Sequence, residues 1–288
     1  MAKDLRSIVR KITELPTLPQ VVTVILSLID SPDSSAEDIN KVMEKDPALV
    51  GKILKLVNSA YYGLPNKVNS VRQSIVILGF STVKSLAISA SVFDLFDSKR
   101  SQAFSREAFW GHSIGCACVS RLVGHREAGV DEETAFVVGL LHDIGKLVID
   151  QYAPAEFDAV VNLAQEKQIS FYEAEQVVLV DTNHAEVGAW VAEQWALSPD
   201  LINAIRNHHA VSTVEDRPSK LLAAICRFAN FICHKRGVGA SGNFNVPQLD
   251  PEAWATMSIK KEDLPKMIEA INAELARTDA FFSMAMSK

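Results

Sequence analysis

The sequence predicts an all-helical protein, and three features of its pattern lead to that fold class. Apolar residues recur at intervals of three and four along nearly the whole chain, which is the period of an amphipathic helix. No stretch alternates apolar and polar residues for long enough to indicate a strand. Gly63 and Gly79 are expected to end helices. The expected helix starts share a capping side chain or a proline, and they are Asp46-Pro47, Ser81, Asp131-Glu132-Glu133 and Ser198-Pro199.

Two polar stretches without a helical pattern, residues 97–102 and 237–247, are candidate boundaries within the chain. The 288 residues are 48% hydrophobic, which is enough to bury one large core or two smaller ones. We therefore expect three parts: an N-terminal helical subdomain over residues 1–98, a multi-helix bundle over 99–236, and a C-terminal loop and helices over 237–288.

Composition excludes several classes of partner. The formal net charge is -6 and no stretch is rich in Lys and Arg, so no nucleic acid is expected. No apolar run reaches the roughly 18 residues of a membrane span and the N-terminus lacks a signal-peptide core, so we expect a cytoplasmic protein without a membrane partner. Four cysteines without a CxxC pair are expected to be reduced thiols packed in helices: Cys116, Cys118, Cys226 and Cys233.

Five of the seven histidines continue the apolar stripe of their predicted helix and are expected to point inward. A single buried histidine is more often a hydrogen-bonded core residue than a ligand. Five together would leave many polar atoms to satisfy, whereas neutral imidazoles with one carboxylate suit divalent iron, manganese or zinc. We therefore predict one shared metal pocket. The histidines are His112, His142, His184, His208 and His209.

The adjacent pair His142-Asp143 is the most informative element of this pattern. An aspartate can bridge two cations through its two oxygens. Lys146 lies one turn further along the predicted helix, where its ammonium can hold either a phosphate oxygen or the aspartate itself. The HDxGK motif is only moderately specific alone, but the ordered histidines around it make the pattern much more specific.

Several segments resemble a known family. LPTLPQVV, DPALVGKILKLVNSAYYG and SVRQSIVILGFSTVKSLAIS are similar to the signature of HDOD domains, which are relatives of the HD and HD-GYP metal-dependent phosphohydrolases. LLHDIGK resembles the HD-GYP core, and the resemblance extends over about residues 15–235. It implies an HD-like helical bundle preceded by an N-terminal helical subdomain.

The resemblance also implies roles for individual residues and a cofactor. One or two divalent transition-metal ions are implied, iron or manganese before zinc or nickel. Lys146 corresponds to a phosphate-contacting lysine and, if the protein is an active enzyme, would be catalytic together with Asp143. The implied metal ligands are His112, His142, Asp143, His184, His208, His209 and, in place of a last aspartate, Asn230.

The chain departs from the HD-GYP pattern at three places. Asn230 brings no negative charge, Ala108 stands where a glutamate is common, and AVSTVED replaces the Gly-Tyr-Pro loop. The resemblance therefore implies an intact site at Asp143, His184, His208 and His209, and weaker binding of a cation near His112 and Asn230.

Three functions remain open from the sequence. The leading hypothesis is a regulatory protein whose degenerate metal pocket senses a small phosphorylated ligand and passes its state to a signalling partner. The main alternative is an active metal-dependent phosphohydrolase acting on a nucleotide or cyclic dinucleotide. The third is a structural interaction protein without metal. The sequence gives no information on the oligomeric state.

Overall fold

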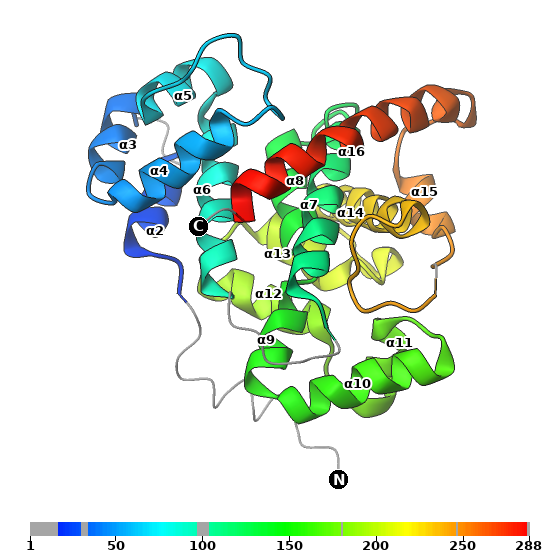
Figure 1. Ribbon diagram of the computed structural model, residues 1–288. Helices are drawn as coiled ribbons and strands as arrows, with labels where there is room; N and C mark the ends of the chain where they lie inside the picture. Colours follow the sequence, from blue (N-terminus) through cyan, green and yellow to red (C-terminus); the bar gives the residue numbers. More distant parts are fainter. Residues whose placement is uncertain (1–16, 30–33, 97–103, 180, 246, 287–288) are drawn as a thin grey trace. The chain divides into compact units, whose positions relative to one another are not determined.

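The structure, a computed structural model, confirms the all-helical fold class. Every regular element of the described residues is an α-helix or a short 3₁₀-helix (Figure 1). No helix among them is both long and apolar enough to cross a membrane. The candidate boundary at 97–102 lies outside the described residues, which are 17–29, 34–96, 104–179, 181–245 and 247–286.

The described chain contains two compact units. The larger comprises residues 98–272, and the smaller comprises residues 16–97 together with 273–288. The last helix therefore contributes its first residues to one unit and its final residues to the other. The division into three parts that we expect from the sequence stays a prediction.

The smaller unit is built around α6, whose side chains are buried along most of its length. The predicted start at Asp46 is confirmed, because its carboxylate accepts a hydrogen bond from the Leu49 amide at 3.0 Å. Its helices are α2 (Gln20–Ile29), α3 (Ala36–Met43), α4 (Pro47–Val57), α5 (Val71–Leu78), α6 (Phe80–Leu95) and the end of α16 (Leu264–Met286).

Two predicted helix ends in this unit differ from the structure. Helix α4 ends at Val57 rather than near Gly63, because the Asn58 side chain donates to the Leu54 carbonyl at 2.8 Å and closes the helix early. Helix α6 begins at Phe80 rather than at Ser81. Gly79, with φ of 87°, ends α5 as predicted and turns the chain directly into α6.

The larger unit places α7 against α8 and α14, and α9 against α12. The predicted starts at Asp131 and at Ser198-Pro199 are confirmed. Its helices are α7 (Arg106–Gly124), α8 (Glu132–Leu141), α9 (Ile144–Tyr152), α10 (Pro154–Lys167), α11 (Phe171–Val178), α12 (His184–Gln194), α13 (Pro199–Asn207), η1 (Val211–Thr213), α14 (Arg217–Arg236), α15 (Pro251–Thr256), η2 (Lys261–Asp263) and the start of α16.

Two glycines allow the close contacts that shape the interior of this unit. A side chain at Gly145 would collide with the His184 carbonyl, so only glycine lets α9 approach α12 this closely. Gly239, with φ of 59°, lies against the Ala108 carbonyl and the His112 amide. The loop after α14 is thereby held against α7, and the adjacent Ala240 amide donates to the Ala108 carbonyl at 2.9 Å.

Candidate metal centre

The His142-Asp143 pair lies at a break between two helices. The sequence pattern suggested one continuous helix through Lys146, but α8 ends at Leu141 and α9 begins at Ile144. The Lys146 amide still donates to the Asp143 carbonyl at 2.9 Å, which keeps Lys146 one turn further on. Both side chains of the pair are fully buried, so the break points an imidazole and a carboxylate into the interior.

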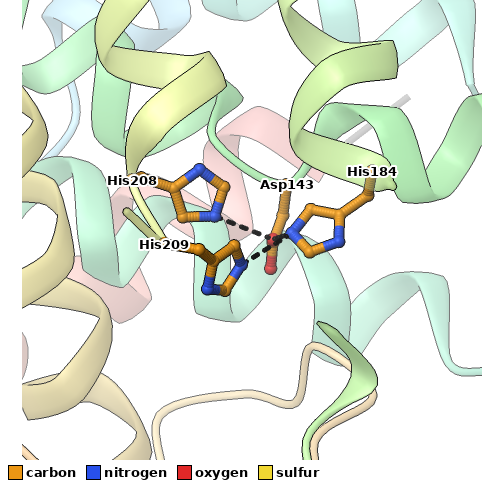
Figure 2. Close-up of side chains that lie close together, drawn as sticks. All are labelled: Asp143, His184, His208 and His209. Atoms are coloured by element: carbon orange, nitrogen blue, oxygen red, sulfur yellow. Dashed lines mark hydrogen bonds and ion pairs between the residues drawn. The ribbon is translucent and has the colours of Figure 1, made fainter. Parts of the chain in front are cut away.

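Three of the predicted histidines converge around the Asp143 carboxylate (Figure 2). His184 comes from the first residue of α12, and His208 and His209 follow α13. Asp143 Oδ1 lies 3.1 Å from His184 Nε2 and 3.9 Å from His208 Nε2. We call this group the Asp143 cluster: Asp143, His184, His208 and His209.

Backbone carbonyls fix the orientation of two buried imidazoles. His142 Nδ1 donates to the Gly139 carbonyl at 2.8 Å, and His208 Nδ1 donates to the Ile205 carbonyl at 2.7 Å. When neutral, each ring presents an Nε2 lone pair to the interior. Both Nε2 atoms and Asp143 Oδ1 are buried without a hydrogen-bond partner. Such orphaned acceptors fit a site for a divalent cation.

Glu175 on α11 is part of this site and was missed in the sequence. Its buried carboxylate accepts from His184 Nδ1 at 2.6 Å and from the His184 amide at 2.8 Å. Burial alone would lower the pKa of His184, but the Glu175 carboxylate raises that pKa above its usual value. A signal was available, because Glu175 lies on the same apolar stripe as Phe171 and Ala174.

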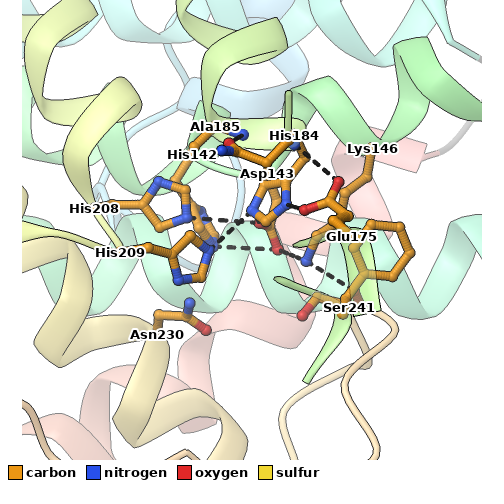
Figure 3. A network of polar contacts seen from close by, with 12 residues as sticks. His142, Asp143, Lys146, Glu175, His184, Ala185, His208, His209, Asn230 and Ser241 are labelled. Atoms are coloured by element: carbon orange, nitrogen blue, oxygen red, sulfur yellow. Dashed lines mark hydrogen bonds and ion pairs between the residues drawn. The ribbon is translucent and has the colours of Figure 1, made fainter. Parts of the chain in front are cut away.

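His142, which Figure 3 shows beside Asp143, also belongs to a second group of side chains. His112 Nδ1 donates to the Val238 carbonyl at 3.1 Å, and His112 Nε2 lies 3.1 Å from Asn230 Oδ1. Cys116 Sγ lies 3.4 Å from the same Nε2 atom. We call this group the His112 cluster: His112, Cys116 and His142.

The structure thus brings all the sequence-predicted ligand positions into one interior region. Asn230 lies beside His112, as the resemblance implied, and it also lines the same pocket as His209. Cys116 was expected only as a packed thiol. All four cysteines are free and buried, as predicted.

His234 is a further histidine that the stripe criterion did not select. Its ring centroid lies 4.5 Å from that of His112, and its Nε2 accepts from Asn243 Nδ2 at 2.7 Å. Burial lowers the pKa of His234 to about 4. This ring is uncharged near neutral pH and orients the loop against the pocket.

Lys146 holds the aspartate, which is one of the two contacts expected for it. Its buried ammonium donates to Asp143 Oδ2 at 2.8 Å and to the Ser241 carbonyl at 2.9 Å, with the Phe171 ring centroid 4.9 Å away. Burial opposes ionisation of Asp143, but His142 and Lys146 outweigh it and hold the pKa of that carboxyl well below its usual range. The loop at 237–247, expected as a boundary, therefore supplies backbone contacts to the site.

The His112 and His208 imidazoles are held in the neutral form that metal ligation needs. Burial, assisted by neighbouring rings, places the pKa values of His112 and His208 well below the usual value. With one carboxylate and several neutral imidazoles, the donor set fits a divalent transition metal.

An open cavity of about 420 Å³ reaches the Asp143 cluster through His209. Tyr172 stacks on the His209 ring with centroids 4.1 Å apart. Arg227 Nη1 lies 3.2 Å from Nδ1 of the same His209 ring. We call this cavity the Arg227 pocket; its polar lining includes Tyr172, His209, Arg227, Asn230, Asn243 and Asn245.

Comparison with known proteins identifies relatives of this chain. Residues 15–211 match the HDOD domain family. An uncharacterised protein of Treponema pallidum is 28% identical over 228 residues, which cover 78% of this chain and 43% of that protein. The chain therefore spans less than half the length of this curated relative.

Solved structures share the fold over nearly the whole chain. An HDOD domain protein of unknown function from Geobacter sulfurreducens has a TM-score of 0.82 at 25% identity, covering 96% of this chain and 97% of that one. A candidate phosphohydrolase from Shewanella amazonensis has a TM-score of 0.76 at 23% identity, covering 97% and 98% of the two chains.

Proposed function

Since the chain belongs to the HDOD domain family, we propose that it is a regulatory protein whose metal pocket senses a small phosphorylated ligand. The Asp143 cluster holds a divalent transition metal, iron or manganese before zinc or nickel. The ligand enters the Arg227 pocket, and the resulting state is passed to a signalling partner. One observation carries the proposal: His209 connects the open pocket to the buried cluster.

The contacts of His209 determine where its proton lies. A guanidinium can only donate, so His209 Nδ1 accepts from Arg227. The neutral ring then carries its proton on Nε2, which lies 3.0 Å from His184 Nε2. Whenever the His184 ring is neutral, its single proton lies on Nδ1, facing Glu175. In that state His209 donates to the His184 lone pair that a cation would use.

An anionic ligand reverses this arrangement. A phosphate group in the Arg227 pocket competes for the guanidinium and draws it from His209 Nδ1. The His209 proton can then reside on Nδ1, and the Nε2 atoms of His209 and His184 both become ligands. Ligand and cation should consequently strengthen each other's binding. The pocket volume lies in the range of small-molecule sites, and Tyr172 adds an aromatic wall.

Charge and access favour regulation over turnover. Asp143 is the one residue of the two clusters that has anionic oxygen atoms. In a two-metal hydrolase, this single carboxylate would have to offset the charge of two cations. The Lys146 ammonium is already held by Asp143 and the Ser241 carbonyl. His184 and His208 are fully buried, so a ligand in the pocket meets the cluster only at His209.

The test measures manganese affinity with and without a panel of nucleotides. Wild-type protein should bind manganese several-fold tighter when a nucleotide is bound, within the usual range of about 5- to 150-fold for coupled sites. Arg227→Met frees His209 Nδ1, so this variant should bind manganese at least as tightly as wild type and show no nucleotide effect. Arg236→Met, exposed on the same helix, is the matched control and should behave as wild type.

Two results would contradict the proposed sensor. One is a manganese affinity that no phosphorylated ligand changes. The other is an Arg227→Met variant that keeps the full nucleotide effect, because the coupling would then not pass through this contact.

The alternative function is an active phosphohydrolase. It is favoured by the orphaned atoms Asp143 Oδ1 and His208 Nε2, and by Asn230, which lines the pocket together with His209. A screen of nucleotides and phosphodiesters with iron or manganese separates the two functions. Turnover at or above about 1 s⁻¹, lost in His142→Ala, would establish the enzyme and overturn the regulatory proposal.

A further inference from the structure

We propose that the His112 cluster is a second metal site in which the Cys116 thiolate supplies the anionic ligand that Asn230 lacks. The site would take a thiophilic divalent ion, zinc above all, with His112 and His142 as nitrogen ligands. This inference rests on the proposed metal-binding role of the pocket. The inference differs from the proposed function because it places a sulfur ligand on a metal ion.

The ligand atoms already have the required spacing. Cys116 follows His112 by four residues on α7, so both side chains leave the same face of the helix. Cys116 Sγ lies 3.4 Å from His112 Nε2, and the three donor atoms of the cluster lie within 4.8 Å of one another. Zinc bonds of about 2.3 Å to sulfur and about 2.0 Å to nitrogen place tetrahedral ligands roughly 3 to 4 Å apart.

Among the described residues, the His112 Nε2 lone pair has the weak Cys116 thiol as a donor, at 3.4 Å, and the His142 Nε2 lone pair has none. His142 Nε2 is buried and makes no hydrogen bond. His112 donates from Nδ1 to the Val238 carbonyl, so its Nε2 lone pair faces the Asn230 amide oxygen at 3.1 Å. Two lone pairs at that distance repel each other, whereas a cation between them would be bound by both. Asn230 can thereby act as a fourth, neutral ligand.

Charge requires an anion at this place. His112, Cys116 and His142 are fully buried and Asn230 is nearly so, which makes an uncompensated divalent ion costly. Asp143 is shared with the other cluster and with Lys146. When the ion binds, the Cys116 S–H bond breaks, a sulfur–metal bond forms, and the proton is released to solvent.

Without a bound ion Cys116 is a protonated thiol, because burial and the neighbouring Cys233 on α14 raise its pKa well above the usual value. The thiolate therefore forms only when a cation binds. Sulfur also changes the metal preference, because thiolate favours zinc while carboxylate with imidazole suits iron or manganese. The two clusters should therefore select different ions.

Cobalt(II) titration tests the site, because a cobalt–thiolate bond has a charge-transfer absorption in the near ultraviolet. Wild-type protein should bind two cobalt ions per chain and show this band. Cys116→Ser should bind one ion and lose the band. Cys118→Ser is the matched control: Cys118 is equally buried on the same helix but outside the cluster, so this variant should keep both ions and the band.

A rescue variant separates ligation from packing. Cys116→Ser combined with Asn230→Asp replaces the lost thiolate by a carboxylate and should regain the second ion without the band. If Cys116→Ser does not fold, X-ray absorption of zinc-loaded wild-type protein decides the question, since one sulfur ligand is expected.

The outcomes distinguish this inference from the proposed function. One ion per chain, bound without sulfur, would overturn the thiolate site and leave the metal in the Asp143 cluster intact. Absence of any bound ion would overturn both. A band that survives in folded Cys116→Ser would show that another cysteine is the ligand and would also overturn the inference.

Discussion

The Asp143 and His112 clusters share the turn at His142-Asp143 but differ in donors and in access. The Asp143 cluster joins a carboxylate to three imidazoles and meets the open Arg227 pocket at His209. The His112 cluster joins two imidazoles and a thiol, lies beside the Asn230 amide, and is fully enclosed. Two neighbouring sites can thus be tuned separately, since each gains or loses charge through its own residues.

The largest effect is expected from Asp143→Asn, which removes the carboxylate of the Asp143 cluster. Loss of a partner behind a metal ligand typically lowers affinity by about 10- to 100-fold, so loss of this ligand should lower manganese affinity by more than about 100-fold. Elemental analysis after dialysis should find no manganese. Glu166→Gln, an exposed carboxylate on α10, is the control. Retention of manganese by Asp143→Asn would contradict the role of this residue as a ligand.

Glu175→Gln sharpens the comparison because Glu175 supports only the Asp143 cluster. The neutral amide accepts a weaker hydrogen bond from His184 Nδ1, so manganese affinity should fall by about 10- to 100-fold. Cobalt binding at the His112 cluster should be unchanged. Glu173→Gln, whose side chain caps the start of the same helix, should leave both sites intact. Equal losses at both clusters would mean that Glu175 acts on the fold and not on one site.

Asn230→Asp tests the His112 cluster. A carboxylate beside His112 Nε2 adds the charge that the wild-type amide lacks, so the second ion should bind about tenfold tighter, equivalent to about 1.4 kcal/mol. Isothermal titration with zinc measures the change. Weaker zinc binding in a folded variant would show that Asn230 does not face this ion.

The smallest effect is a loss of stability on acidification of metal-free protein. Histidines with lowered pKa values are neutral when folded but become protonated when unfolded below about pH 6.5, so stability falls as the pH drops below that value. His184, whose raised pKa adds stability at low pH, opposes this trend. The histidines with lowered pKa values outnumber His184, and they are His112, His208, His209 and His234.

Thermal denaturation in a chelator measures this dependence. The melting temperature should fall between about pH 7.5 and about pH 5.5, by about 2 to 4 °C for each kcal/mol lost. A melting temperature that rises over this interval would mean that His184 outweighs the buried neutral rings.

The sequence predicted the parts of the site that follow from helical periodicity. Inward stripes identified the histidines of both clusters, and the His142-Asp143 pair marked their junction. Periodicity also places Glu175 on an apolar stripe, but a lone glutamate at such a position does not by itself indicate a histidine partner. The break between α8 and α9 gave no signal, because the stripe continues through it.

Contacts between distant segments could not be read from the sequence. The loop at 237–247 has no periodic pattern, yet the Val238 and Ser241 carbonyls hold His112 and Lys146. The role of Arg227 depends on α14 passing beside the end of α13, which local sequence does not determine. Cys116 was visible as a buried thiol, but its distance from His142 depends on the packing of α7 against α8.

Anomalous diffraction from crystals grown with manganese tests the central claim most directly. The account predicts a manganese peak within bonding distance of Asp143 Oδ1, His184 Nε2 and His208 Nε2. Metal-loaded crystals without a peak at these three atoms would contradict it.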